Sequence, residues 1–129
     1  MSHTLPTAPE GDLTIRTLAM PKDTNANGDI FGGWLVSQMD LGGAIFAKQI
    51  SQSRVVTVSI DHMDFIRPVS VGDIICCHAK CLTIGRTSMK IQIQVWAVPY
   101  DSSERALVTQ GIFTFVAIDK DGKPQAVKN

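Results

Sequence analysis

The sequence has no block of like charges, no long apolar run and few cysteines, and each absence excludes a class of protein. Its 12 basic and 12 acidic residues balance to a formal net charge of zero, so nothing suggests nonspecific binding to nucleic acid or to an anionic membrane. The longest apolar run is far too short to span a bilayer. The N-terminus lacks the basic and apolar regions of a secretory signal. We therefore expect a cytoplasmic protein that binds neither nucleic acid nor membrane.

The three cysteines, Cys76, Cys77 and Cys81, leave an odd thiol in an apolar segment, which argues against a disulfide framework. No second Cys or His pair supplies the spacing of zinc ligands. We expect buried reduced thiols and no metal site. The chain also lacks the Gly-x-Ser-x-Gly elbow of serine hydrolases and a phosphate-binding loop of the Walker type.

The length of 129 residues is typical of one domain. Hydrophobic periodicity predicts a strand at 13–18, a helix from 33 or 34 to about 50, and strands at 54–66, 73–84, 89–97 and 105–118. Short turns join the later strands, and parallel strands need long crossovers, so the sheet should be mainly antiparallel. The pattern predicts an α+β fold with the helix on one face of the sheet. Such a layer leaves an edge strand exposed, which favours self-association.

One carboxylate stands alone in the predicted helix. From Trp34 to Ala47, Asp40 is the only ionisable residue. Burying an isolated carboxylate costs several kcal/mol or more unless it is paired, solvated or protonated, so Asp40 has a function or lies on a solvent-exposed helix edge. On a helical wheel it shares its face with mostly small residues: Gly33, Val36, Ser37, Gly43, Ala44 and Ala47. These leave room for a ligand or another helix; close helix packing, with Asp40 bonded to a neighbouring donor, is the alternative.

Three segments carry a family resemblance. They are Asn25 to Gly33 (Asn-Ala-Asn-Gly-Asp-Ile-Phe-Gly-Gly), Trp34 to Asp40 (Trp-Leu-Val-Ser-Gln-Met-Asp) and Phe65 to Asp73 (Phe-Ile-Arg-Pro-Val-Ser-Val-Gly-Asp). Together they closely resemble the YciA-type acyl-CoA thioesterases of the hotdog superfamily. The resemblance implies a curved antiparallel sheet of about five strands wrapped around one long central helix, in a domain at 13–122 between a flexible N-terminal tail at 1–12 and a C-terminal tail at 123–129.

The resemblance also implies an activity and an assembly. The reaction is hydrolysis of acyl-CoA to free acid and CoA, without a cofactor, since CoA is part of substrate and product. The assembly is a homodimer, further assembled as a trimer of dimers.

Thioester hydrolysis needs a group that polarises the carbonyl, a group that activates or replaces water, and a grip on CoA. Gly32 and Gly33 lie where the predicted helix begins, where backbone N–H groups lack intrahelical partners and carry the positive end of the helix dipole. Glycine lets a carbonyl oxygen approach closely. We predict Gly32 or Gly33 as the oxyanion donor; loop flexibility and tight packing are the alternative.

Asp40 lies about two turns further on, roughly 10 Å from the helix start at a rise of ~1.5 Å per residue. A reacting carbonyl must lie ~3 Å from both groups, so one helix cannot readily supply both. We predict that the partner subunit contributes Asp40, in agreement with the resemblance, which places active sites at the dimer interface. Asp40 would act as general base on water or attack the carbonyl to form a mixed anhydride, and the sequence does not choose between these.

Asn25 matches the family's amide position in the loop, which implies that it orients water or the thioester; a pure turn role is the alternative. Asn27 precedes Gly28 and serves the turn, because Asn-Gly favours positive φ. Ala44 stands where some hotdog thioesterases carry a hydroxyl residue. Any further group that holds water must therefore come from elsewhere, with Ser37 as a weak candidate.

The turn that begins at Gly85 offers hydroxyl and backbone donors beside a guanidinium, which suits phosphate oxygens. The resemblance implies CoA contacts in two segments: Thr57, Val58 and Ser59, and Arg86, Thr87 and Ser88. A solvated hairpin role is the alternative for Arg86. Further phosphate partners of lower rank are Arg54, Arg67 and Lys90.

Two function classes stay open. The first is an acyl-CoA thioesterase in which Asp40 carries the chemistry, and the second is a non-catalytic acyl-CoA binding or sensing module on the same scaffold. The presence of both Asn25 and Asp40 favours turnover. Hotdog dehydratases rely on histidine, and no histidine lies between these two residues, which disfavours dehydration.

Overall fold

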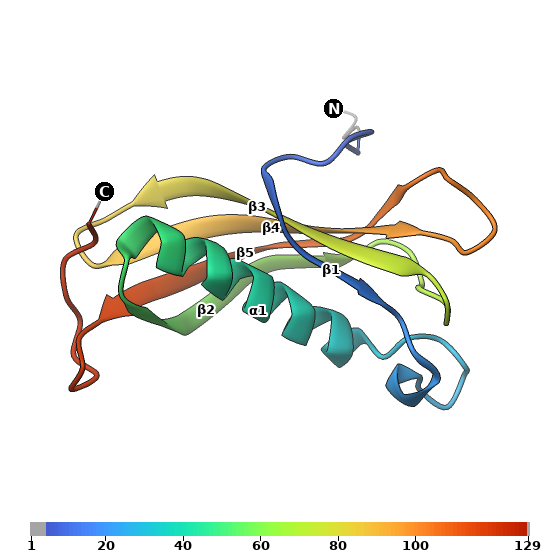
Figure 1. The fold of residues 1–129 in the computed structure, drawn as a ribbon, viewed down its shortest axis with the longest axis horizontal. Helices are drawn as coiled ribbons and strands as arrows, with labels where there is room; N and C mark the ends of the chain where they lie inside the picture. The colour runs from blue at the N-terminus through green and yellow to red at the C-terminus, as the bar shows by residue number, and fades with distance from the viewer. Residues whose placement is uncertain (1–4, 129) are drawn as a thin grey trace.

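The computed structural model describes residues 5–128, which form one long helix laid across a five-stranded sheet (Figure 1). In chain order the elements are β1 (Asp12–Leu18), the 3-10 helix η1 (Pro21–Asp23), α1 (Gly32–Ser51), β2 (Arg54–Phe65), β3 (Ile74–Ile84), β4 (Ser88–Val98) and β5 (Ala106–Ile118). Each predicted strand and the predicted helix is present, with its ends close to the predicted ones. The predicted α+β architecture is confirmed.

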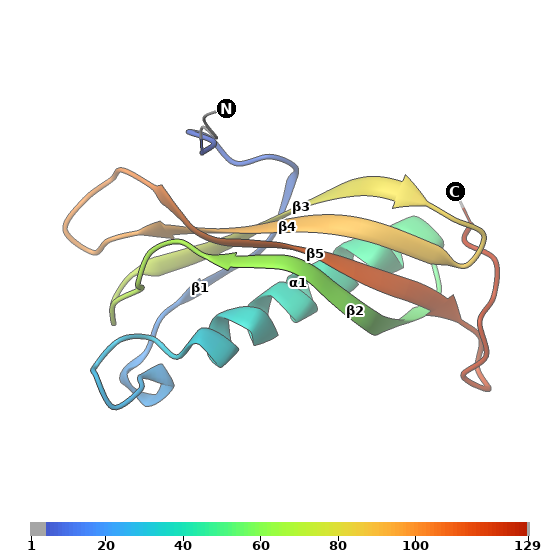
Figure 2. The ribbon, with the colours of Figure 1, turned by 180° about the vertical axis from the view of Figure 1, so that it is seen from behind.

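The sheet has the order β1-β3-β4-β5-β2, and every neighbouring pair is antiparallel. β3, β4 and β5 pair in sequence through short turns, which only antiparallel strands allow. α1 lies on one face of the sheet in Figure 1, and Figure 2 shows the opposite face without a helix over it. The sheet is therefore covered on one side within the described residues.

The core lies between α1 and the sheet. Ile91 and Ile93 of β4 and Phe115 of β5 are fully buried there, as alternate residues of a strand with one covered face should be. Glycines let the helix approach closely. A Cβ at Gly43 would stand 2.5 Å from Ile93 Cδ1 and 2.8 Å from Phe115 Cζ. This part of the small-residue face of the helix therefore serves helix–sheet packing.

β2 is an edge strand, paired with β5 on one side only. Of its 12 residues, 10 are exposed and two are half-buried. The exposed ones include Val56, Val58 and Ile60, with exposed fractions of 41%, 55% and 42%. Two irregularities interrupt the pairing with β5, near residues 58 and 62. A long exposed edge strand with unpaired backbone groups is a template for pairing with another chain.

Both ends of the described chain contact the sheet. The Glu10 backbone N–H donates to Gln94 Oε1 at 3.0 Å, and Gln94 Nε2 donates to Glu10 Oε1 at 3.0 Å. Because Gln94 is fully buried in β4, this pair of bonds anchors the segment that precedes β1. After β5, the Val127 N–H donates to the carbonyl oxygen of Arg86 at 2.8 Å, which holds the C-terminal segment beside the β3–β4 turn.

The three cysteines are free thiols, as predicted. The predicted burial is confirmed for Cys76 and Cys77 and is wrong for Cys81, which is half-buried near the end of β3. Burial, together with the neighbouring Cys76, raises the pKa of Cys77 to about 12. Cys77 is therefore a protonated core residue at neutral pH.

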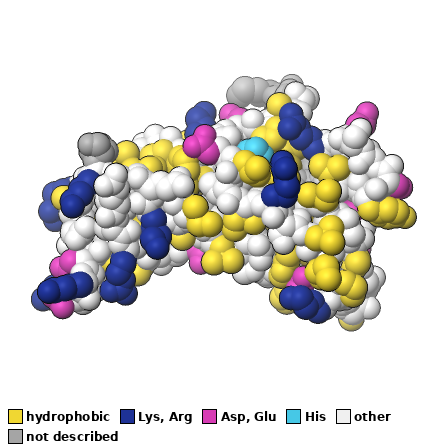
Figure 3. All heavy atoms as spheres, viewed as in Figure 1, with side chains coloured by type: hydrophobic (Ala, Val, Ile, Leu, Met, Phe, Trp, Pro, Cys, Tyr) yellow, Lys and Arg dark blue, Asp and Glu magenta, His cyan; other side chains and the backbone are white. Residues whose placement is uncertain are grey.

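The surface has no strongly charged area on the face seen in Figure 3, where Lys and Arg side chains are scattered. Hydrophobic side chains extend over the same face around the helix. Within residues 5–128, no helix has the length and apolar character needed to cross a membrane.

Candidate active site

α1 begins at Gly32 without a side-chain cap. The preceding Phe31 is extended (φ −62°, ψ 129°), and the first turn carries no acidic residue. The N–H groups of Trp34 and Leu35 donate to the Phe31 carbonyl oxygen at 3.0 and 3.4 Å. Among the described residues, the N–H groups of Gly32 and Gly33 have no acceptor. These two donors, at the positive end of the helix dipole, are available to a carbonyl oxygen.

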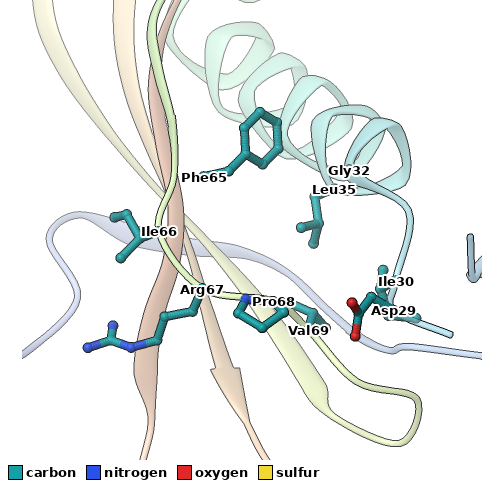
Figure 4. Close-up of a pocket in the computed structure, with 9 residues that line it drawn as sticks. All are labelled: Asp29, Ile30, Gly32, Leu35, Phe65, Ile66, Arg67, Pro68 and Val69. Atoms are coloured by element: carbon teal, nitrogen blue, oxygen red, sulfur yellow. The ribbon is translucent and has the colours of Figure 1, made fainter. Parts of the chain in front are cut away.

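Gly32 lines a pocket of about 250 Å³ between the start of α1 and the segment that ends β2 (Figure 4). The other lining residues are Asp29, Ile30, Leu35, Phe65, Ile66, Arg67, Pro68 and Val69. Figure 4 shows Phe65 and Leu35 pointing into the space between β2 and α1, whereas the side chain of Arg67 points away from it. The pocket therefore offers an apolar surface directly beside the free donors.

Asp40 is half-buried, near the middle of α1. The hydroxyl of Thr57, an exposed residue of β2, donates a short hydrogen bond to Asp40 Oδ1. The carboxylate thus has the neighbouring donor that the alternative prediction named, yet it is not sealed inside the protomer. With one oxygen held by Thr57, the other is open to accept a proton from water.

Asp40 and Gly32 do not meet within one protomer. About two turns of α1 separate them, or ~12 Å at ~1.5 Å per residue. Asp40 is bonded to Thr57, near the start of β2, whereas a Cβ at Gly32 would lie 3.5 Å from the ring of Phe65, the last residue of β2. The two halves of the predicted catalytic set therefore lie toward opposite ends of the same exposed strand.

Asn25 closes the loop before α1. Its Oδ1 accepts the backbone N–H groups of Asn27 at 2.9 Å and Asp29 at 3.2 Å, and its own N–H donates to the Asp29 carbonyl oxygen at 2.8 Å. Gly28 in this loop has φ 84°, as the Asn-Gly pair predicted. These bonds show that Asn25 stabilises the turn, which was the alternative role predicted for it. Its Nδ2 has no acceptor among residues 5–128 and stays free to donate.

The two segments assigned to CoA lie side by side across the sheet, with only β5 between them. Val116 of β5 pairs with Val56 of β2 on one side and with Ser88 of β4 on the other. Thr57 is the residue after Val56 in β2, and Ser88 lies in β4, on the other side of β5. The backbones of β2 and β4 are about 10 Å apart, which is two strand spacings. The exposed residues of this area are Thr57, Val58, Ser59 and Arg86, and Thr87 and Ser88 are half-buried.

Two contacts of the site were not predicted: the bond between Thr57 and Asp40, and the ring of Phe65 beside Gly32. Both contacts join α1 to β2. A contact between two elements is not visible in the hydrophobic periodicity of either element, so the sequence could not predict it. The Phe65 motif marked the segment as important without saying what it touches.

The described histidines lie apart from the start of α1. His62, in the second irregularity of β2, has φ 55° and lines a separate pocket of about 130 Å³ with Gln92 and Gln110. His78 Nδ1 lies 3.3 Å from the Gly11 carbonyl oxygen. In the described part of the chain, no group of three or more His, Cys, Asp or Glu residues could hold a metal ion.

A five-stranded antiparallel sheet packed on one long helix, with uncapped donors at the helix start and a carboxylate about two turns later, defines a hotdog-fold protein of the thioesterase class. A model of the Thioesterase superfamily matches residues 27–100. The chain therefore belongs to the thioesterase superfamily, among its YciA-type members, as the three motifs predicted.

Individual relatives support this assignment. The chain is 57% identical over 122 residues to the acyl-CoA thioester hydrolase YciA of Escherichia coli strain K12, with 92% of each chain covered. A hexameric thioesterase from Yersinia pestis superposes with a TM-score of 0.89 at 56% identity, covering 95% of this chain and 99% of that one. A hexameric hotdog fold thioesterase of Campylobacter jejuni superposes with a TM-score of 0.86 at 41% identity, covering 92% and 91%. The predicted hotdog fold is confirmed.

Proposed function

We propose that the protein hydrolyses the thioester of acyl-CoA to a free carboxylic acid and CoA. The observation that carries this proposal is the pair of free N–H donors at Gly32 and Gly33, of which Gly32 lines a mostly apolar pocket. An acyl chain in that pocket would bring its carbonyl oxygen to the donors. Relatives at 55–57% identity carry the name acyl-CoA thioester hydrolase, which supports the same substrate class.

The active site forms between two copies of the chain. Thr57 and Phe65 are equally distant in sequence from Asp61, so antiparallel pairing of β2 with a second β2 about a two-fold axis at Asp61 brings Thr57 of one copy opposite Phe65 of the other. Each Asp40, bonded to Thr57, then faces the partner's Gly32, which packs against Phe65. The separation of the two groups within one protomer supports this arrangement.

Apolar surface beside β2 supports the same pairing. On α1, Leu41 and Ile45 have exposed fractions of 56% and 41%, and on β2 Val58 has 55%. Large exposed side chains on neighbouring elements mark an interaction surface. The solved relatives from Yersinia pestis and Campylobacter jejuni are named hexameric. We therefore assign a dimer through β2 as the catalytic unit and a trimer of such dimers as the full assembly.

In the reaction, Asp40 takes a proton from water, and the water oxygen attacks the thioester carbon. The N–H group of Gly32 or Gly33 stabilises the oxyanion that forms. The tetrahedral intermediate then collapses, the C–S bond breaks, and the proton held by Asp40 passes to the leaving thiolate. The products are the carboxylic acid and the CoA thiol. Thr57 positions Asp40, and the free Nδ2 of Asn25 is placed on the loop to orient water or the thioester.

CoA lies across the sheet, from Thr57, Val58 and Ser59 of β2 to the β3–β4 turn. The exposed strand residues contact the pantetheine chain. Arg86, Thr87 and Ser88 hold phosphate oxygens through the guanidinium, hydroxyl and backbone donors. The β3–β4 turn is firm enough for this role, because the Gly85 N–H donates to Ser88 O at 2.8 Å and the C-terminal segment braces it.

Asp40→Asn tests the proposal, because it removes the charge with little change of shape. We expect kcat for release of CoA thiol from short and medium acyl-CoA to fall about 10²–10⁴-fold, with the Kd for CoA, measured by calorimetry, changed less than about twofold. Asp101→Asn, an exposed carboxylate in the β4–β5 turn, is the control and should keep full turnover. A folded Asp40→Asn variant with unchanged turnover would remove Asp40 from the chemistry. Wild-type protein that binds CoA but hydrolyses no acyl-CoA would be a binding module.

A further inference from the structure

Arg67 and Arg105 line a third pocket, of about 280 Å³, which shares only Arg67 with the pocket at Gly32. It lies where the segment before β1 passes the start of β5. The remaining lining residues are Leu5, Pro6, Thr7, Trp96, Ala106 and Leu107. The pocket therefore combines two permanent positive charges with apolar walls.

The guanidinium of Arg67 is held in place. Arg67 Nη1 donates to the carbonyl oxygen of Leu107 at 2.7 Å. Arg67 lines both pockets, and Figure 4 shows its side chain directed away from the pocket at Gly32, which leaves its guanidinium available to the third pocket. A guanidinium carries five N–H donors in a fixed plane, and a single carbonyl leaves most of them free.

Neither arginine has a carboxylate partner in the described structure. The ion pairs among residues 5–128 are Lys22–Asp23 and Lys80–Glu10. Two guanidinium groups that line one pocket without a counter-charge repel one another, and an anion between them would remove that repulsion. The charge distribution therefore favours an anionic occupant.

The apolar wall of this pocket is rigid. Trp96 has an exposed fraction of 2% and donates its Nε1–H to Gln94 Oε1 at 3.0 Å. Gln94 in turn is bonded to Glu10 in the segment that passes over the pocket. The Trp96 wall is thus part of a buried hydrogen-bond network, and the two exposed arginines lie at its edge.

We propose that this pocket binds a phosphate group of a nucleotide or nucleotide-like ligand. The planar forks of two arginines match the several oxygens of a phosphate better than the two oxygens of a carboxylate. The volume lies near the lower end for ligand pockets, which suits a phosphate or diphosphate with the rest of the ligand outside. The ligand is either CoA itself, through its own phosphates, or a separate nucleotide.

Calorimetric titration with pyrophosphate and with ADP tests the site without depending on turnover. We expect Arg105→Gln and Arg67→Lys each to weaken binding about tenfold, since a hydrogen bond to a charged group is lost. Lys120→Gln is the control, because Lys120 is an exposed cation in the turn after β5 and does not line this pocket. It should bind like the wild type. Thermal unfolding checks that each variant is folded.

Competition identifies the source of the phosphate. If CoA supplies it, saturating CoA abolishes the pyrophosphate signal, and Arg105→Gln raises KM for acyl-CoA while kcat is retained. If a separate nucleotide supplies it, pyrophosphate still binds in the presence of CoA and KM is unchanged. The proposal is overturned if wild-type protein binds neither probe, if Arg105→Gln binds them as tightly as wild type, or if malonate binds as tightly as pyrophosphate.

Discussion

Gly32 and Gly33 contribute only backbone N–H groups to the proposed site, so the residue type does not distinguish which of the two acts. The sequence named both because two glycines precede an apolar helical run, and the structure leaves both N–H groups without an acceptor in its described part. At the residue scale, Asp40 was identifiable because a lone carboxylate in an apolar helix conflicts with its surroundings. Its bond to Thr57 was not, because nothing in the sequence states how helix and strand are rotated against each other.

A Gly32→Pro variant distinguishes which of the two N–H groups is the oxyanion donor. Gly32 is the first residue of α1 and follows an extended Phe31, so proline is accommodated there and removes only the N–H group. If Gly32 is the oxyanion donor, Gly32→Pro lowers kcat about 10²–10³-fold. Gly32→Ala is the matched control, because it keeps the N–H and adds a Cβ at an ordinary 3.5 Å from the Phe65 ring. Steady-state kinetics on both variants decide, and normal kcat in folded Gly32→Pro assigns the role to Gly33.

Cys77 makes the free energy of unfolding fall as the pH rises into the alkaline range. Burial, with Cys76 nearby, raises its pKa from 9.0 to about 12, so the folded state keeps a proton that the unfolded chain has lost. The stabilising contribution is complete below pH 9.0 and is lost as the pH rises toward about 12. We expect roughly 1.4 kcal/mol of unfolding free energy to be lost per pH unit in that window. Cys77→Ala lacks this dependence. Urea unfolding of both proteins should show their difference shrinking above pH 9; a constant difference contradicts the assignment.

At the scale of elements, the sequence predicted each strand and the long helix because the patterns are strong: strict alternation in β4 and a helical run bounded by Gly-Gly and by the serines near 51–53. The strand order was not readable, since β2 pairs with β5 although β3 and β4 lie between them in the sequence. β2 also contains irregularities that alternation does not reveal, including His62 at φ 55°. Pairing between distant segments depends on packing of the whole sheet rather than on local propensity.

Helix–sheet contact at Gly43 sets how closely α1 lies on the sheet. Alanine is favoured over glycine in a helix by about 1 kcal/mol, but its Cβ would stand 2.5 Å from Ile93 Cδ1 and 2.8 Å from Phe115 Cζ. Overpacking of this kind costs about 1–3 kcal/mol. We expect Gly43→Ala to lower the free energy of unfolding by about 1 kcal/mol net. Gln49→Ala, at an exposed helix position, should change it less than about 0.5 kcal/mol. Chemical denaturation measures both, and a stabilised Gly43→Ala variant would contradict the packing argument.

At the scale of the whole molecule, β2 is the element that contacts both groups of the proposed active site. Its exposed edge carries Thr57 toward one end and Phe65 at the other, beside the two groups that must meet across a thioester. The prediction that a second subunit contributes Asp40 was made from the sequence alone, because helix geometry separates Asp40 from Gly32. The surface that we propose for the second subunit, the exposed edge of β2, was visible only in the structure.

Mixed dimers test whether the two groups act across subunits. One copy carries Asp40→Ala and the other Gly32→Pro, each inactive alone if the N–H of Gly32 is the donor. In a mixed dimer, the intact Gly32 of the first copy faces the intact Asp40 of the second, so one of the two sites is complete. Random pairing makes about half of the dimers mixed, which predicts recovery of about a quarter of wild-type turnover. Co-refolded mixtures are assayed by thiol release, with each variant refolded alone as the control. If both groups came from the same subunit, every site would carry one defect, and the mixture would stay as inactive as its components.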